Sequence, residues 1–145
     1  MEITQIENID VKGIAVRTDN LSEMDSTTAK IGSMWERFYA ELAPSLKEGA
    51  NVYGLYTNYE SDHNGVFDVI ACSDKVEAKN VSSYQLEAGN YLVFKGTGQM
   101  PQVVIDLWRQ VWEYFESPTS QHKRTFTTDF ELYKSENEVE LFISV

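Results

Sequence analysis

The sequence predicts an α+β fold built from two tandem strand-helix-strand-strand repeats. Two observations support this prediction: one amphipathic helical segment occurs twice, and β-rich runs flank both copies in the same order. Two such halves form a pseudo-two-fold antiparallel sheet, with two helices on one face and a central cleft where the halves meet. We expect one domain over residues 1–145, with repeat one at about 1–79 and repeat two at about 80–145.

The helical repeat is the clearest signal. Trp35 and Trp108 lie 73 positions apart (35 to 108), and the same offset pairs apolar residues along both segments. The pairs are Ile31 with Val104, Met34 with Leu107, Phe38 with Val111, Tyr39 with Trp112, and Leu42 with Phe115. Both sets follow the i, i+3, i+4, i+7, i+8, i+11 spacing of an amphipathic helix. We therefore expect helices near residues 26–43 and 101–117.

The ends of both helices carry suitable residues. Ser26 or Thr27 is expected to cap the first helix, because a side-chain oxygen there can accept from the first free N–H groups. Pro101 suits the first turn of the second helix, where no backbone donor is needed. Pro44 and Pro118 lie near the two C-terminal ends, which they help to terminate.

The flanking segments are rich in β-branched and aromatic residues, which favour strands. Before the helices lie the expected strands 13–18 and 89–95, and after them the hairpins 52–59 with 66–72 and 125–133 with 139–145. Polar turn residues at 61–65 and 135–137 join the strands of each hairpin.

The charge balance excludes some partners. Twelve basic residues against 23 acidic ones give a net charge of -11. Nucleic-acid binding begins with Lys and Arg on phosphates, so we expect no direct nucleic-acid partner. Solubility is the simplest meaning of this acidity, and the alternative is a field that favours a cationic ligand or a basic protein partner.

The sequence also bears on location. No apolar run approaches the roughly 20 residues that cross a bilayer, so no membrane partner is expected. The first residues are acidic and do not resemble a signal peptide. The chain has a single cysteine, Cys72, which is consistent with a reducing compartment. We expect Cys72 to be a small buried hydrophobic residue. We expect a cytoplasmic protein.

Several segments carry a resemblance to a known family. They are Trp108 with Trp112-Glu113-Tyr114-Phe115, the run from Asp129 to Tyr133 within the segment that begins at Arg124, and the closing strand Val139 to Val145. Together with the order of the elements, these segments carry a resemblance to the gyrase-inhibitor-like superfamily that covers essentially the whole chain. That group includes the effector-binding domains of AraC-type and multidrug-responsive transcription activators. The chain shows no helix-turn-helix segment, so it resembles the effector domain alone, and direct control of transcription is not expected.

The resemblance implies a small-molecule site. Members of the family bind lipophilic, often cationic molecules in an aromatic cleft between the halves, and a carboxylate matched by Glu131 faces the positive charge. Strand alternation places Glu131 on the same face as Asp129 and Tyr133. A desolvated carboxylate there needs a cation or hydrogen bonds. The residues alone, without the resemblance, favour a different interpretation. In it, Glu131 faces solvent on one side of the strand, and Phe130 and Leu132 are buried on the other.

Aromatic residues supply the expected walls of the cleft, since their faces attract cations and contact flat ligands. The candidates are Trp35, Tyr39, Trp108 and Trp112 on the helix stripes, and Tyr53 and Tyr56 on the first hairpin. An aromatic stripe at helical spacing is more often simply core, and that alternative stays open here.

These features lead us to expect a non-enzymatic binder of lipophilic, cationic organic molecules. One alternative is a hydrolase of strained-ring electrophiles that uses the same Glu and a cleft Trp, as some relatives do. Another is an acidic inhibitor module that binds a protein such as gyrase. We expect no cofactor or metal, because His63 and His122 lack partners at metal-ligand spacing, and 96–98 is too short a glycine loop for phosphate.

Overall fold

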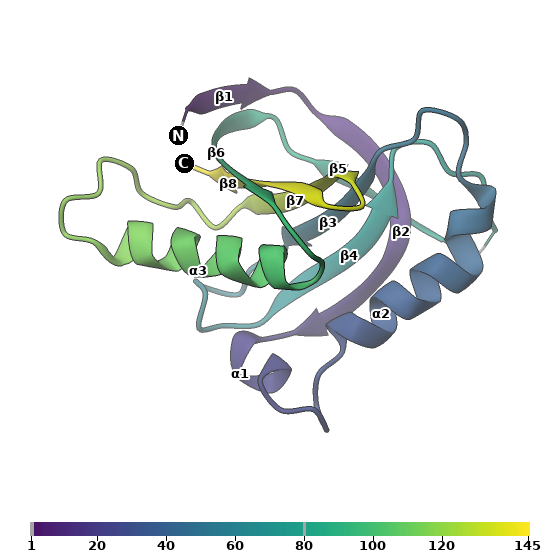
Figure 1. The fold of residues 1–145 in the computed structure, drawn as a ribbon, viewed down its shortest axis with the longest axis horizontal. Helices are drawn as coiled ribbons and strands as arrows, with labels where there is room; N and C mark the ends of the chain where they lie inside the picture. Colours follow the sequence, from purple (N-terminus) through teal and green to yellow (C-terminus); the bar gives the residue numbers. More distant parts are fainter. Residues whose placement is uncertain (1, 80) are drawn as a thin grey trace.

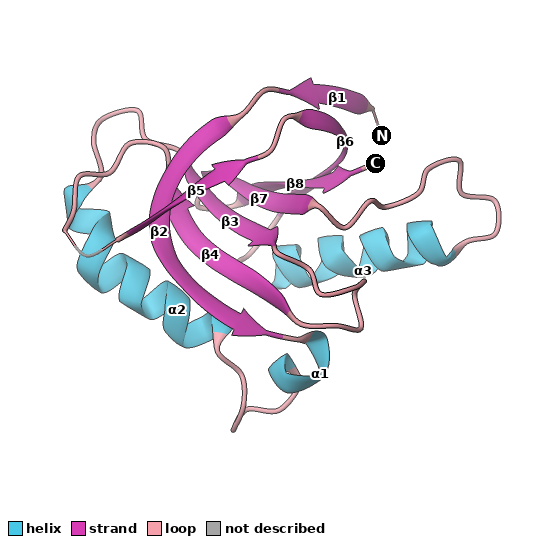
Figure 2. Ribbon diagram, turned by 180° about the vertical axis from the view of Figure 1, so that it is seen from behind, coloured by secondary structure: helices cyan, strands magenta, loops and turns pink. Residues whose placement is uncertain are grey.

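A computed structural model describes residues 2–79 and 81–145 as an α+β fold with a curled sheet of eight antiparallel strands (Figure 1). The strands are β1 (Ile3–Ile6), β2 (Ile9–Thr18), β3 (Val52–Thr57), β4 (Phe67–Ser73), β5 (Ser82–Leu86), β6 (Gly89–Thr97), β7 (Thr128–Ser135) and β8 (Glu138–Ser144). The helices are α1 (Asn20–Glu23), α2 (Ile31–Arg37) and α3 (Gln102–Glu116), and α2 runs into a π-helical turn, η1 (Phe38–Leu42), and a 3-10 turn, η2 (Ala43–Ser45). Seen from behind, the strands lie in front of the two longer helices (Figure 2).

The order of the strands follows the predicted pseudo-two-fold symmetry. Across the sheet they run β1-β6-β8-β7-β3-β4-β2-β5. Each strand has a counterpart in the other half: β1 and β5, β2 and β6, β3 and β7, β4 and β8. When every strand is replaced by its counterpart and the row is reversed, the order is unchanged. The strands β3 and β7 meet at the centre, and Gly54 lies directly opposite Glu131 there.

The two faces of the sheet have different cores. Because β side chains alternate, one face directs Leu55, Phe130 and Phe142 into the curl of the sheet itself, where the two Phe rings stack at 4.5 Å. On the other face, α2 and η1 pack through Met34 and Phe38 on β2 and β4, and α3 packs on β6 and β8. The central strands β3 and β7 therefore lie between the two helices, where the cleft is found.

The start of α2 differs from the prediction. The helix begins at Ile31 instead of near residue 26, and neither Ser26 nor Thr27 caps it. The carboxylate of Glu23 accepts instead from the backbone N–H groups of Lys30 at 2.8 Å and Ile31 at 3.0 Å. A side chain from a separate short helix thus satisfies donors that sequence reasoning assigned to a local cap.

Most other expected elements lie close to their predicted places, although β2 starts at Ile9 instead of residue 13 and α1 was not expected. α3 and both hairpins match the predicted segments, although Pro101 is the residue before α3 and not in its first turn. The edge strands β1 and β5 were not predicted, because each is only a few residues long. Within residues 2–79 and 81–145, no helix is both long enough and apolar enough to cross a membrane.

Candidate functional site

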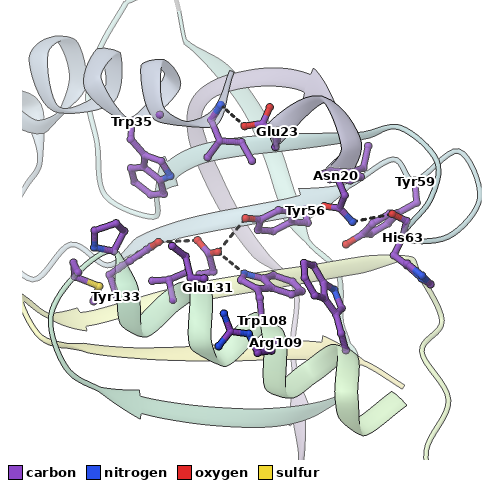
Figure 3. A pocket seen from close by; sticks show the side chains of 18 of the residues that line it. Asn20, Glu23, Trp35, Tyr56, Tyr59, His63, Trp108, Arg109, Glu131 and Tyr133 are labelled. Atoms are coloured by element: carbon purple, nitrogen blue, oxygen red, sulfur yellow. Dashed lines mark hydrogen bonds between the residues drawn. The ribbon is translucent and has the colours of Figure 1, made fainter. Parts of the chain in front are cut away.

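A cavity of about 690 Å³ lies between α2 and α3, over the centre of the sheet. Its lining comes from both helices, from α1, from β3 and β7, and from the loops that follow β3 and α3. Figure 3 shows Glu131 in the middle of this site, with Trp35 and Tyr133 toward one end and Asn20, Tyr59 and His63 toward the other.

Glu131 is held by three neutral hydrogen-bond donors. Its side chain is 2% exposed. Trp108 Nε1 donates to Glu131 Oε2 at 2.8 Å, and the Tyr56 hydroxyl donates to the same oxygen at 3.0 Å. The Tyr133 hydroxyl donates to Oε1 at 2.7 Å. Trp108 comes from α3, Tyr56 from β3 and Tyr133 from β7, so the fold fixes the carboxylate from three directions (Figure 3).

Gly54 makes room for this carboxylate. It pairs with Glu131 across the β3–β7 seam, so its missing side chain leaves space on the cavity face. A Cβ atom at residue 54 would overlap Glu131 Oε1 and would stand 3.2 Å from Trp35 Cζ2. The position of the carboxylate therefore depends on a glycine in the neighbouring half of the fold.

Burial changes the ionisation of this group. Loss of water raises the pKa of Glu131, and the hydrogen bonds from Trp108, Tyr133 and Tyr56 partly oppose the rise. The pKa of Tyr133 and that of Tyr56 are also raised, first by burial and then by the nearby Glu131 charge. Both phenols remain protonated donors near neutral pH.

Most of the predicted aromatic residues reach the cavity. Trp35, Trp108 and Tyr56 form the inner walls, and the Tyr56 and Trp108 rings lie 5.0 Å apart in an edge-to-face arrangement. Tyr39 is 58% exposed and Trp112 is 40% exposed, so both lie at the mouth.

Tyr53 is the predicted site residue that the structure does not bring to the cavity. It lies on the opposite face of β3 from Tyr56, 4% exposed, with its ring against Phe130. Burial raises the pKa of Tyr53 to about 12. The two tyrosines are three positions apart along an alternating strand, so they could not share a face.

Sequence reasoning missed some residues of the site. Tyr133 shared the predicted face of Glu131, which was a usable signal, but Tyr59 and Arg124 carried none. Asp129 lies behind them, fully buried, and accepts from the Tyr59 hydroxyl at 2.6 Å and from Arg124 Nη2 at 2.7 Å. Its other oxygen accepts from the Ser144 N–H at 2.9 Å.

A pseudo-two-fold curled sheet with two helices on one face is the gyrase-inhibitor-like fold, and here a cavity lies between the two helices. A family model described as "Cass2: Integron-associated effector binding protein" matches residues 2–145. The chain belongs to this family of effector-binding proteins.

Individual relatives agree with this assignment. The crystal structure of the integron cassette protein VCH_CASS2 from Vibrio cholerae is 52% identical, with a TM-score of 0.94, over 99% of this chain and 94% of that one. The putative transcriptional regulator protein YobU of Bacillus subtilis is 27% identical over 92% of this chain and 88% of its own. The structure of SAV2435 bound to tetraphenylphosphonium has the same fold, with a TM-score of 0.71 at 19% identity over 98% of this chain and 91% of that one.

Proposed function

We propose that this protein binds lipophilic organic cations in the cavity between α2 and α3. Glu131 is the charge partner of the ligand. Trp35, Trp108 and Tyr56 supply inner walls, and Tyr39 and Trp112 cover the mouth. The ligand enters between the helices and places its positive centre beside the carboxylate.

The observation that carries this proposal is a buried carboxylate whose hydrogen-bond donors are all neutral. Within the described residues, no Lys, Arg or His lies within ion-pair distance of Glu131. A buried charge is costly unless it is paired, and burial raises the pKa of Glu131 accordingly. A ligand cation supplies the missing partner, while the aromatic rings around it stabilise positive charge at roughly 0.5–2 kcal/mol each.

The relatives support the choice of ligand. SAV2435, which shares the fold, is seen with tetraphenylphosphonium, a lipophilic cation with four aromatic rings. A cavity of about 690 Å³ falls in the size range of drug-sized sites.

The two alternatives fit the site less well. A protein-binding inhibitor would have a closed, packed cleft, whereas this cleft holds an open cavity. A hydrolase needs a carboxyl group that can activate water, whereas Glu131 already accepts three hydrogen bonds from Trp and Tyr donors, which leaves one acceptor site on Oε1. The raised pKa of Glu131 is compatible with general-base chemistry, and the three fixed donors together with the aromatic walls favour binding.

The test compares two ligands of one shape in a variant that keeps the shape of the side chain. Glu131→Gln removes the charge, and neutralising one partner of a desolvated pair costs about 2–4 kcal/mol. We expect the affinity for tetraphenylphosphonium to fall by about 30-fold to 700-fold. Neutral tetraphenylsilane, delivered from a small volume of organic cosolvent, should bind the variant at least as well as the parent. Quenching of tryptophan fluorescence reports both affinities.

The matched control is Glu136→Gln. Glu136 also lines the cavity, but it is exposed and lies beyond β7, so its loss should change cation affinity less than two-fold. Cation affinity within two-fold of the parent in Glu131→Gln would contradict the role of Glu131. An equal loss for both ligands would show that packing, not charge, had changed.

A further inference from the structure

The end of the cavity away from Tyr133 contains a guanidinium group that the protein does not satisfy. Arg124 lies in the loop between α3 and β7 and lines the cavity with Tyr59 and His63. Its side chain is only 6% exposed, and its Cζ stands 4.3 Å from the centre of the Phe126 ring. The proposed function assigns no role to this residue.

Arg124 has more hydrogen-bond donors than the described residues have acceptors for them. Arginine has five N–H donors and no acceptor. In the described part of the chain, the Arg124 side chain makes one hydrogen bond, from Nη2 to Asp129 Oδ2 at 2.7 Å. Its Nε is buried with no partner.

Asp129, the partner of Arg124, already accepts as many hydrogen bonds as a carboxylate can. It accepts from Tyr59, from Arg124, and from both the backbone N–H and the hydroxyl of Ser144. The carboxylate is therefore saturated, and it cannot take up the other donors of Arg124. Since buried polar groups in proteins are nearly always paired, the unused donors indicate an acceptor that the protein does not itself provide.

We infer that the Arg124 edge of the cavity is a second recognition point, which binds an oxygen acceptor of the ligand. A carboxylate is preferred, because two oxygens in one plane match the planar guanidinium fork. The inference rests on the proposed function and narrows it: the preferred ligands are amphipathic zwitterions, with the positive centre at Glu131 and an anionic oxygen at Arg124.

The spacing of the two points is set by the strand. Asp129 and Glu131 lie on the same face of β7, two residues apart, so their Cα atoms are separated by about 7 Å. Arg124 is tied to the first of these carboxylates and the ligand cation to the second. The two charged groups of a ligand that spans both points therefore bind beside neighbouring positions on one face of β7.

Two dyes of one skeleton test the inference. Rhodamine 110 is a zwitterion with a free carboxylate, and rhodamine 123 is its methyl ester, a plain cation. In the parent, the acidic residues around the cavity repel the carboxylate of rhodamine 110. We expect the contact with Arg124 to offset this repulsion, so that the dissociation constant of rhodamine 110 lies within ten-fold of that of rhodamine 123. Fluorescence anisotropy measures both.

The variant Arg124→Met should raise the ratio of the dissociation constant of rhodamine 110 to that of rhodamine 123 at least five-fold, mainly by weakening the binding of rhodamine 110. Arg37→Met is the control, because Arg37 is exposed, pairs with Glu41 and does not line the cavity, so the ratio in this variant should equal that of the parent. A smaller shift in Arg124→Met overturns the inference. If that variant does not fold, the parent decides: a preference for the ester above ten-fold overturns the inference. Failure of the parent to bind either dye is a different result, which overturns the proposed function itself.

Discussion

At the scale of single residues, the site depends on a complementary pair. Glu131 places a carboxylate in the interior, and Gly54, opposite it on β3, leaves the volume that the carboxylate occupies. Neither residue has this meaning by itself. A strand glycine without a positive φ is normally a small loss of stability, and here it is the condition for a buried charge.

Gly54→Ala should therefore affect both folding and binding. The added Cβ would overlap Glu131 Oε1 and press on Trp35, and overpacking of this kind costs about 1–3 kcal/mol. We expect a lower free energy of unfolding in urea and a weaker affinity for tetraphenylphosphonium, because the carboxylate must move.

Gly32→Ala is the matched control for that experiment. Gly32 lies in α2, and a Cβ there would meet nothing within 4 Å. Alanine is the better helix former, so stability should rise by roughly 0.5–1 kcal/mol. If the two alanine variants had similar stabilities, the close fit at residue 54 would be wrong.

At the scale of the elements, α2 is held by a side chain from another helix. Glu23 accepts from Lys30 N, from Ile31 N, and from the Thr18 hydroxyl at 2.6 Å. This carboxylate joins the end of β2, the short α1 and the start of α2. It also faces the cavity, so the cap and the site share one residue.

Glu23→Ala should destabilise the protein by about 0.5–2 kcal/mol, the usual effect of losing a helix cap. Urea unfolding followed by circular dichroism measures the change. Ser26→Ala removes one of the two residues that local sequence rules favoured as the cap. It should alter stability by less than about 0.5 kcal/mol, since Ser26 is exposed and does not cap α2. Equal effects of the two substitutions would contradict the role given to Glu23.

At the scale of the whole molecule, the halves exchange their outer strands. β1, from the first half, pairs with β6, and β5, which precedes β6, pairs with β2. The central pair β3 and β7 also joins the two halves. Because each half completes the sheet of the other, we propose that residues 1–145 behave as one domain.

One cooperative transition is the expected result of chemical unfolding. Trp35 lies in the first half, and Trp108 and Trp112 lie in the second. In Trp35→Phe, fluorescence reports only the second half, while far-ultraviolet circular dichroism reports both. The two midpoints should coincide within error. Separate midpoints would show that the halves unfold independently.

The order of the two long helices and of the strands and hairpins beside them was determined by the sequence itself. The spacing from Ile31 to Leu42 and its repeat from Val104 to Phe115 identify two amphipathic helices, and the alternation from Asp129 to Tyr133 places Glu131 opposite Phe130. Side chains a few positions apart create these patterns, so they can be read without coordinates. The same local alternation could have shown that Tyr53 and Tyr56 face opposite ways.

Only the tertiary structure decided how the site is made. Tyr56 lies 75 positions from Glu131, and Trp108 lies 23 positions from it, yet all three meet at one carboxylate. The space left by Gly54, the cap from Glu23 and the unused donors of Arg124 likewise depend on neighbours that are distant along the chain. Local periodicity determines which face a residue occupies. Packing between elements determines what that residue meets, and therefore whether a buried charge already has its partner or is left for a ligand to complete.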